Sequence, residues 1–345
     1  MHSIFENDVY FSETQKTLSI KRQIRKLLTG LAVPQEYCCL EVEQMTEPLK
    51  VILSTKGNSF TKDVTDSHLF LGYKPLIIGF DRSKHLLDND DVCLSFVRSA
   101  FASNSTWKGL PTDSSAVAKL MLKKKKEMDV NGRHICLYEG CNGVHSFLSP
   151  LHQAANNALE KFRNRSAGNI SLTGNLFDQV RIAYAVPRKI SIITVSDGSL
   201  INMFPTDLHG PIGTSFYAGS LRIGGMANEQ VESLTRVAIS DIDVSAYKHT
   251  YALGKNHMNG LQKEEQFALH HRRSSVFNFP LPAATLRYRE LTRISSFDHG
   301  IHRIHFYQIL NDEVLANSPS TLGHIQQYYA QWRMDRGLKT KLYFR

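Results

Sequence analysis

The clearest pattern of apolar and polar residues lies between positions 188 and 243. Residues 190–195 form an unbroken apolar and β-branched run without helical periodicity, which favours a buried strand over a helix. The Asp197-Gly198 pair follows, and glycine accepts the positive φ that a tight turn requires. The pattern predicts a hairpin in which residues 199–204 return beside the first strand, and residues 212–218 continue the extended structure.

A glycine pair, Gly224 and Gly225, precedes a predicted helix. The apolar residues after it recur at spacings that place them on one helical face: Ala227, Val231, Leu234 and Ala238. Asn228 is suited to the N-cap position, and the free N–H groups of a helix start, beside Arg222, could hold a phosphate. The alternative is an ordinary capped helix after a glycine turn, which is the commoner arrangement.

The C-terminal part contains a long polar connection, a hairpin and a closing helix. Residues 246–279 are rich in His and Arg, and a connection of this length either covers a site or forms a surface excursion. Strands are predicted at residues 285–294 and 301–310. The helix predicted at residues 321–332 has a wide apolar face, suited to a dimer interface or to packing within the chain: Leu322, Ile325, Tyr328, Tyr329 and Trp332.

The N-terminal half mixes predicted helices and strands. An amphipathic helix is expected at residues 12–29, and two more at residues 114–128 and 150–162. Gly168 and Asn169 mark the predicted boundary between two domains. Short strands are expected at residues 39–42, 49–54, 76–80, 92–97 and 133–138.

Residues 63–75 combine carboxylates with His68 and Tyr73, so this segment could line a site. The alternative is that Asp63 and Asp66 cap turns while His68 packs on a strand. No internal repeat is evident between the two halves. The N-terminal half is therefore expected to be a separate lid or docking domain rather than a second barrel produced by duplication.

The length and composition fit a two-domain globular protein. The chain has 345 residues and contains no apolar run of about eighteen or more, which predicts no transmembrane helix. The N-terminus lacks the basic start and the apolar core of a secretory signal, so a cytoplasmic location is expected. The five cysteines are an odd number and two are adjacent, which argues against a disulfide framework.

The formal net charge of +9 suits an anionic partner, such as a nucleotide phosphate or a nucleic acid. The dense basic run from Lys123 to Lys126 ends a predicted helix, where cations are favourable, and no aromatic residues alternate with it. Nucleic-acid binding is therefore the least favoured alternative. No metal site is predicted, because one cluster of candidate ligands lacks a recognised zinc spacing: His134, Cys136, Cys141 and His145.

Two stretches resemble the flavin reductase-like family of FMN-binding split barrels. The first contains the Asp197-Gly198 turn, Asn202-Met203-Phe204-Pro205-Thr206, and Ser220-Leu221-Arg222 before the helix with Asn228. The second is the predicted late hairpin, where His299-Gly300-Ile301-His302 precedes a strand. Together they cover residues 175–345.

This resemblance implies an α+β fold. Residues 169–345 would form a split β-barrel that binds FMN, and residues 1–168 would form a mixed α/β domain. The implied function is an FMN-binding oxidoreductase, an NAD(P)H-dependent flavin reductase, which forms a homodimer with flavin sites at the shared interface. The alternative is a non-enzymatic flavin-binding protein whose N-terminal domain restricts the nicotinamide site.

The resemblance also implies roles for individual residues. The phosphate would lie near Arg222 and Asn228. The ribityl chain or the ring edge would contact Asn202, Met203, Thr206 and Ser220. His302 would lie nearest the nicotinamide, and a hairpin histidine without that role is an equal alternative. The hydride chemistry would belong to the flavin, which the protein would position and tune.

Overall fold

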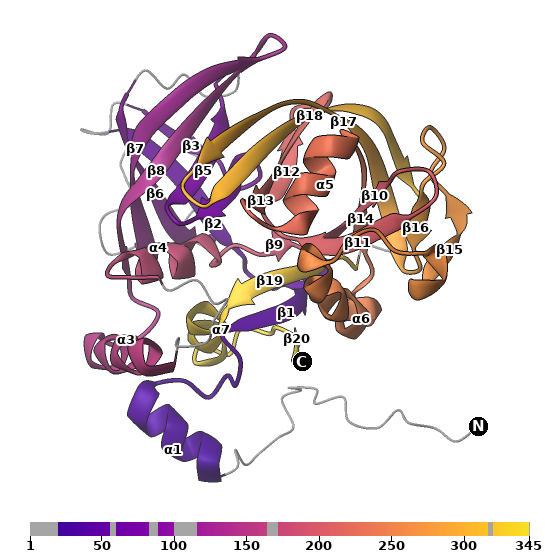
Figure 1. Ribbon diagram of the computed structural model, residues 1–345. Coiled ribbons are helices and arrows are strands. Elements are labelled where there is room, and N and C mark those ends of the chain that lie inside the picture. Colours follow the sequence, from indigo (N-terminus) through magenta and orange to yellow (C-terminus); the bar gives the residue numbers. More distant parts are fainter. Residues whose placement is uncertain are drawn as a thin grey trace.

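Two seven-stranded sheets form most of the structure (Figure 1). The computed structural model describes residues 20–55, 60–82, 89–99, 116–163, 172–316 and 320–344. The predicted domain boundary at Gly168 and Asn169 lies outside the described residues. The chain is a sheet-rich protein of mixed α and β elements, as expected.

The first sheet, called here the N-terminal sheet, has the strand order β3-β2-β6-β7-β8-β5-β4. Its outer hairpins pair β2 with β3 and β4 with β5, and its longest hairpin joins β7 to β8. Its strands are β2 (Leu49–Thr55), β3 (Thr61–Asp63), β4 (His68–Tyr73), β5 (Leu76–Asp81), β6 (Asp91–Arg98), β7 (Ala116–Val130) and β8 (Arg133–His145).

The second sheet, called here the C-terminal sheet, has the order β11-β10-β14-β17-β18-β13-β12. The predicted hairpin at Asp197-Gly198 is confirmed as β10 paired with β11, and the predicted late hairpin as β17 paired with β18. Its strands are β10 (Ser191–Ser196), β11 (Ile201–Thr206), β12 (His209–Ile212), β13 (Phe216–Arg222), β14 (Arg236–Ile242), β17 (Thr285–His299) and β18 (His302–Val314).

The two sheets have the same topology. Both contain, in chain order, two hairpins, a single strand and a long hairpin, and the order across each sheet is identical when these strands are matched. This strand order fits a duplicated sheet, which was the alternative to a separate lid or docking domain. A short repeat accompanies it: Thr65-Asp66-x-His68 with Gly72, and Thr206-Asp207-x-His209 with Gly213 at the same spacing.

Corresponding strands of the two sheets pack against each other. One buried apolar cluster, called here the inter-sheet cluster, joins Leu71 and Leu137 of the N-terminal sheet to Ile212, Ile304 and Phe306 of the C-terminal sheet. The strands β4 and β12 approach closely, since a Cβ on Gly210 would lie 2.6 Å from a methyl carbon of Leu69. The N-terminal half is thus part of one packed body with the C-terminal sheet.

A third, four-stranded sheet ties distant parts of the chain together in the order β20-β1-β19-β9. Its strands are β1 (Tyr37–Glu41), β9 (Arg188–Lys189), β19 (Leu322–Gln326) and β20 (Leu342–Tyr343). Helix α7 (Gln327–Met334) follows β19, and its aromatic side chains belong to the core of the N-terminal sheet: Tyr328, Tyr329 and Trp332. The C-terminal segment therefore packs across the predicted domain boundary.

Three helix predictions were wrong in part or whole. Residues 114–128, including the lysine run, were expected to be helical, but their described part lies in strand β7, where pairing with β8 overrides helix propensity. Residues 321–332 begin as β19. The stripe at residues 227–238 is split, because α5 (Met226–Leu234) ends at Thr235 and β14 follows; its N-cap is Gly225, not Asn228.

The remaining helices and short elements complete the fold. The described part of the helix expected at residues 12–29 is α1 (Ile20–Thr29), and the helix expected at residues 150–162 is confirmed as α3 (Pro150–Arg163). Residues 246–279 contain regular elements, and those within residues 247–258 contact β11 and α5. They include α6 (Tyr247–Ala252), three-residue and six-residue 3-10 turns, and β15 (Leu269–Arg273), which pairs with β16 (Pro280–Pro282).

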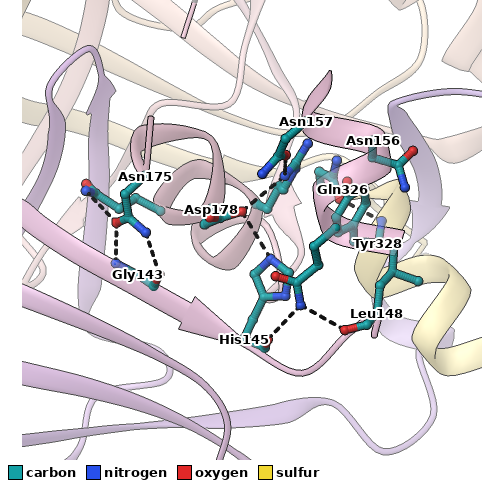
Figure 2. Close-up of polar contacts among 12 residues, drawn as sticks. Gly143, His145, Leu148, Asn156, Asn157, Asn175, Asp178, Gln326 and Tyr328 are labelled. Atoms are coloured by element: carbon teal, nitrogen blue, oxygen red, sulfur yellow. Dashed lines mark hydrogen bonds and ion pairs between the residues drawn. The ribbon is translucent and has the colours of Figure 1, made fainter. Parts of the chain in front are cut away.

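Helices α3 and α4 (Leu176–Ala183) dock on β8 through polar contacts (Figure 2). The Asn175 amide bonds both the backbone N–H and C=O of Gly143, at 2.6 and 2.7 Å. Asp178 lies 3.4 Å from His145 and 3.1 Å from Arg181. His145, one of the clustered candidate metal ligands, therefore packs beside a carboxylate in this helix contact. Among the described residues, no three His, Cys, Asp or Glu side chains are grouped to hold a metal.

None of the helices among the described residues combines the length and apolar character that crossing a membrane requires.

Candidate functional site

A cavity of about 520 Å³ lies where the two sheets meet, and is called here the inter-sheet cavity. Both copies of the Thr-Asp-x-His motif border it, with Asp66 and His68 from one copy and Asp207 and His209 from the other. Its lining also contains four cationic side chains: Lys50, Arg188, Lys189 and Arg289. The segment at residues 63–75 thus lines a cavity, and its Asp63 also caps a turn by accepting from the Thr65 N–H.

Buried cationic and neutral groups define the side of the cavity near β4. Arg188 donates to the Ala183 carbonyl at 2.8 Å and to Nε2 of His68 at 2.9 Å. Nδ1 of His68 lies 2.7 Å from the Val64 carbonyl, so Nδ1 carries the proton and Nε2 accepts. Burial, with the Arg188 charge, lowers the pKa of His68 to about 3. Burial lowers the pKa of Arg188 to about 10, so it stays cationic at neutral pH.

The opposite side is formed by an aromatic pair and a second arginine. The rings of His209 and Tyr217 stack at 5.8 Å between centroids, and Nδ1 of His209 lies 2.7 Å from the Tyr217 hydroxyl. Nε2 of His209 lies 3.2 Å from the Lys189 carbonyl, so it carries the proton and Nδ1 accepts from Tyr217. Burial lowers the pKa of His209. Arg289 lies 3.5 Å from Asp241, which partly neutralises it.

A second cavity, of about 90 Å³, is called here the small cavity and shares Asp207 with the first. Thr206, Tyr251 and His324 also line it. Burial alone would raise the pKa of the Asp207 carboxyl, but hydrogen bonds from His324 and Tyr184 and the charge of His324 lower it. Asp207 is therefore a carboxylate at the junction of both cavities.

Of the residues expected to bind the flavin, Thr206 lines the small cavity. Asn202 is fully buried, and its amide donates to Gln230 at 2.8 Å and to the carbonyls of Asn256 and Asn259. Met203 is buried in an apolar cluster. The direct contacts expected between these two residues and a cofactor stay predictions, since both side chains pack inside the protein.

The other expected residues surround the end of β13. Asn228 is buried and lies 2.9 Å from Nε2 of His305. Ser220 is buried, with its hydroxyl 3.3 Å from Nδ1 of His302. Arg222 is exposed at the end of β13, just before the glycine pair. The expected phosphate corner thus keeps its arginine at the surface, whereas Asn228 turns toward the sheet.

His302 lies beneath the turn that joins β4 to β5. It is 1% exposed, the edge of the Tyr73 ring lies against it at 4.5 Å, and the Tyr73 N–H lies 3.4 Å from its Nε2. Burial, and then the charge of Arg222, lowers the pKa of His302 to about 4, so the ring is neutral at neutral pH. In this structure the N-terminal sheet covers the residue expected to face a nicotinamide.

Sequence reasoning missed several groups around the cavities. The repeated Thr-Asp-x-His motif was the available signal for Asp207 and His209, and for the pairing of the two sheets. Tyr251 and His324 carry no local motif. They meet because β19 returns to the four-stranded sheet, next to the end of β11.

No family model matches this chain, and no curated protein matches it. Among solved structures, it is similar to the NADH:FAD oxidoreductase SgcE6 of Streptomyces globisporus C-1027, with 11% identity, 47% of this chain and 96% of that chain covered, and a TM-score of 0.39. It is also similar to BorF, the flavin reductase component of a bacterial two-component tryptophan halogenase, with 12% identity, 48% of this chain and 98% of that chain covered, and a TM-score of 0.39. A third similar structure is an FMN-binding protein from Thermus thermophilus, with 13% identity, 47% of this chain and 95% of that chain covered, and a TM-score of 0.37.

The extent of these matches agrees with the predicted resemblance: about half of the chain is similar in structure to flavin reductases and FMN-binding proteins.

Proposed function

We propose that this chain binds FMN in the inter-sheet cavity and is an NAD(P)H-dependent oxidoreductase of the flavin reductase type. The observation that carries the proposal is the cavity itself. Its volume of about 520 Å³ lies within the range of roughly 300 to 1,000 Å³ that suits cofactor-sized ligands. It combines cationic side chains with aromatic rings, a pairing that suits a ligand with a phosphate and a flat ring system.

The residues present can be matched to the parts of FMN. Lys189, an exposed lysine of the cavity lining, would hold the phosphate together with Lys50. His209 and Tyr217 would bound the ring system, while Asp207 would bond its polar edge. Bound FMN would supply the hydride chemistry, accepting from NAD(P)H and reducing an acceptor. The neutral rings of His68 and His209 would leave the charge balance to the lysines and arginines.

An FMN titration of the full chain, followed by quenching of flavin fluorescence, tests this proposal. We expect saturation near one flavin per chain, with binding weakened about tenfold in Lys189→Ala, because a charge-assisted phosphate contact is lost. The exposed Lys255→Ala is the matched control and should bind like the wild type. Arg222→Ala distinguishes the two locations: weakening there, with Lys189→Ala unchanged, would move the phosphate to the corner predicted from the sequence.

NAD(P)H oxidation by the FMN-saturated protein then tests the enzyme activity. If the protein binds FMN saturably but consumes neither NADH nor NADPH, the proposed reductase activity is contradicted. The alternative, a non-enzymatic flavin-binding protein, would then stand.

That second candidate is favoured by one observation, the cover of Tyr73 over His302. If the N-terminal sheet restricts nicotinamide access, Tyr73→Ala should raise NAD(P)H oxidation above that of the wild type. A point variant is the sharper experiment, because deleting the N-terminal half would remove β1 from β19 and strip α7 of its core partners. Equal inactivity of wild type and Tyr73→Ala would count against a restricting role.

A further inference from the structure

The small cavity is lined by a series of hydrogen-bonded groups that shares only Asp207 with the proposed FMN site. Nδ1 of His324 lies 2.8 Å from Oδ2 of Asp207, and the Tyr184 hydroxyl donates to the same oxygen at 2.9 Å. Nε2 of His324 is hydrogen-bonded to the Tyr251 hydroxyl. The thiol of Cys39 lies 2.7 Å from that hydroxyl. Asp207 follows β11 and Tyr184 follows α4, while the other groups lie on β19, α6 and β1, so only the folded chain assembles them.

The positions of the protons in this series of hydrogen bonds follow from the Asp207 carboxylate at one end of it. The Asp207 carboxylate can only accept, so Nδ1 of His324 carries a proton and donates to it. In a neutral imidazole Nε2 is then an acceptor, and the Tyr251 hydroxyl donates to it. If His324 binds a second proton, Nε2–H donates to the Tyr251 oxygen instead. The Tyr251 proton is then available to a group in the cavity.

A second observation indicates a ligand. Thr250 also lines the small cavity, is 1% exposed, and its buried hydroxyl has no hydrogen-bond partner among the described residues. A buried hydroxyl without a partner costs free energy unless a ligand or a water bonds it. The volume of about 90 Å³ corresponds to about three waters, or to a molecule of about three to five non-hydrogen atoms.

The charge of the lining limits which small molecule fits. Asp207 is a carboxylate at the cavity, so an anion would meet like charge there. The Thr250 hydroxyl is a donor that suits an acceptor oxygen, and the rest of the lining includes the apolar Ile190 and Pro205. A small neutral molecule with one carbonyl oxygen satisfies both conditions.

We propose that the small cavity binds a neutral carbonyl compound of this size, whose oxygen accepts a hydrogen bond from Thr250, and from Tyr251 only when His324 holds a second proton. His324 and Asp207 position Tyr251 and hold the proton that Tyr251 would pass on. The binding does not depend on FMN. Use of this proton in a reduction of the carbonyl would rest on the proposed function.

Acetamide and acetate are matched probes, because they have the same shape and differ in charge. Ligand-observed NMR with the full chain, without FMN, should show that acetamide binds. Acetate should bind at least about tenfold more weakly than acetamide, because it carries the charge that Asp207 repels. Thr250→Val should weaken acetamide binding about tenfold, as expected for one lost hydrogen bond at a buried site. Tyr251→Phe should weaken it less, because the Tyr251 proton is donated to His324. Tyr343→Phe, which alters a tyrosine outside the cavity lining, is the control and should leave binding unchanged.

Acetate binding as tightly as acetamide would overturn the proposal, and so would acetamide binding that Thr250→Val does not weaken. Because no flavin is present, these outcomes are separate from the FMN titration. A chain that binds acetamide as described but fails to bind FMN would keep this site and lose the proposed function.

Discussion

Replacing Gly300 with alanine is expected to disturb the contact between the two sheets. Gly300 lies in the turn between β17 and β18, has a φ of 60°, and faces the turn between β4 and β5. A Cβ there would overlap the Lys74 carbonyl oxygen and a ring carbon of Pro75. The Ile301 N–H, which donates to the same carbonyl at 3.1 Å, would be displaced with it.

The magnitude has two parts. An alanine forced into the left-handed region costs about 1 to 2 kcal/mol. Overlap with backbone atoms, which cannot rotate away as a side chain can, adds about 1 to 3 kcal/mol. Gly132 gives the matched control: it lies in the corresponding turn between β7 and β8, has a φ of 81°, and a Cβ there would meet no atom within 4 Å. Gly132→Ala should therefore show the backbone cost alone.

Urea unfolding followed by circular dichroism measures the free energies of unfolding of both variants. We expect Gly300→Ala to lose about 1 to 3 kcal/mol more than Gly132→Ala. Separation of the turns would also expose His302, whose pKa of about 4 should then rise toward its ordinary value in Gly300→Ala alone. Equal destabilisation of the two variants, with His302 unchanged, would refute the reasoning that the turn at Gly300 holds the sheets together.

Three further predictions concern buried polar groups. The pKa of His302 is about 4 in the folded protein and near 6.5 in the unfolded chain, so this side chain lowers the free energy of unfolding as the pH falls from 6.5 to 4. Within this pH range His302→Gln should reduce the slope of the unfolding free energy against pH by up to about 1.4 kcal/mol per pH unit. An unchanged slope would contradict this. The fully buried Glu290 side chain accepts hydrogen bonds from the N–H groups of Val276 and Phe277. Glu290→Gln should therefore lower the free energy of unfolding in urea by about 1.5 to 3 kcal/mol, and the exposed Glu265→Gln should leave it almost unchanged. Similar losses in both variants would be inconsistent with the buried bonds. Arg333 is fully buried and donates hydrogen bonds to the Glu47 carbonyl and the Thr340 hydroxyl. Arg333→Met should therefore lower the free energy of unfolding in urea by about 3 kcal/mol. An unchanged free energy would mean that these acceptors find other partners.

Local patterns predicted the parts of the fold that depend on neighbouring residues. The hairpin at Asp197-Gly198 was predictable because its strands are adjacent and its turn has a specific backbone requirement. Strand β7 was not, because its lysine run has no intrinsic strand preference and becomes a strand through pairing with β8.

The duplicated plan was harder to detect because it is carried by strand order, while the recognisable sequence repeat is confined to the motif around His68 and His209. Thr206, which was expected to bind the flavin, is the last residue of β11 and lines the small cavity. Asn202 looked like a ligand-binding residue, but an amide on a strand can equally well satisfy backbone carbonyls of a packed connection, as it does here. Tyr251 and His324 are brought to Asp207 by long-range pairing, which no local window contains.

The four-stranded sheet also bears on how the chain is made. Strand β1 leaves the ribosome early, but its partners β19 and β20 follow only after the whole C-terminal sheet has been synthesised. Until then the core of the N-terminal sheet lacks Tyr328 and Trp332, and the edges of β1 are unpaired. The first half is therefore a candidate client for a chaperone during translation, and its native state is reached when the last strands close the sheet.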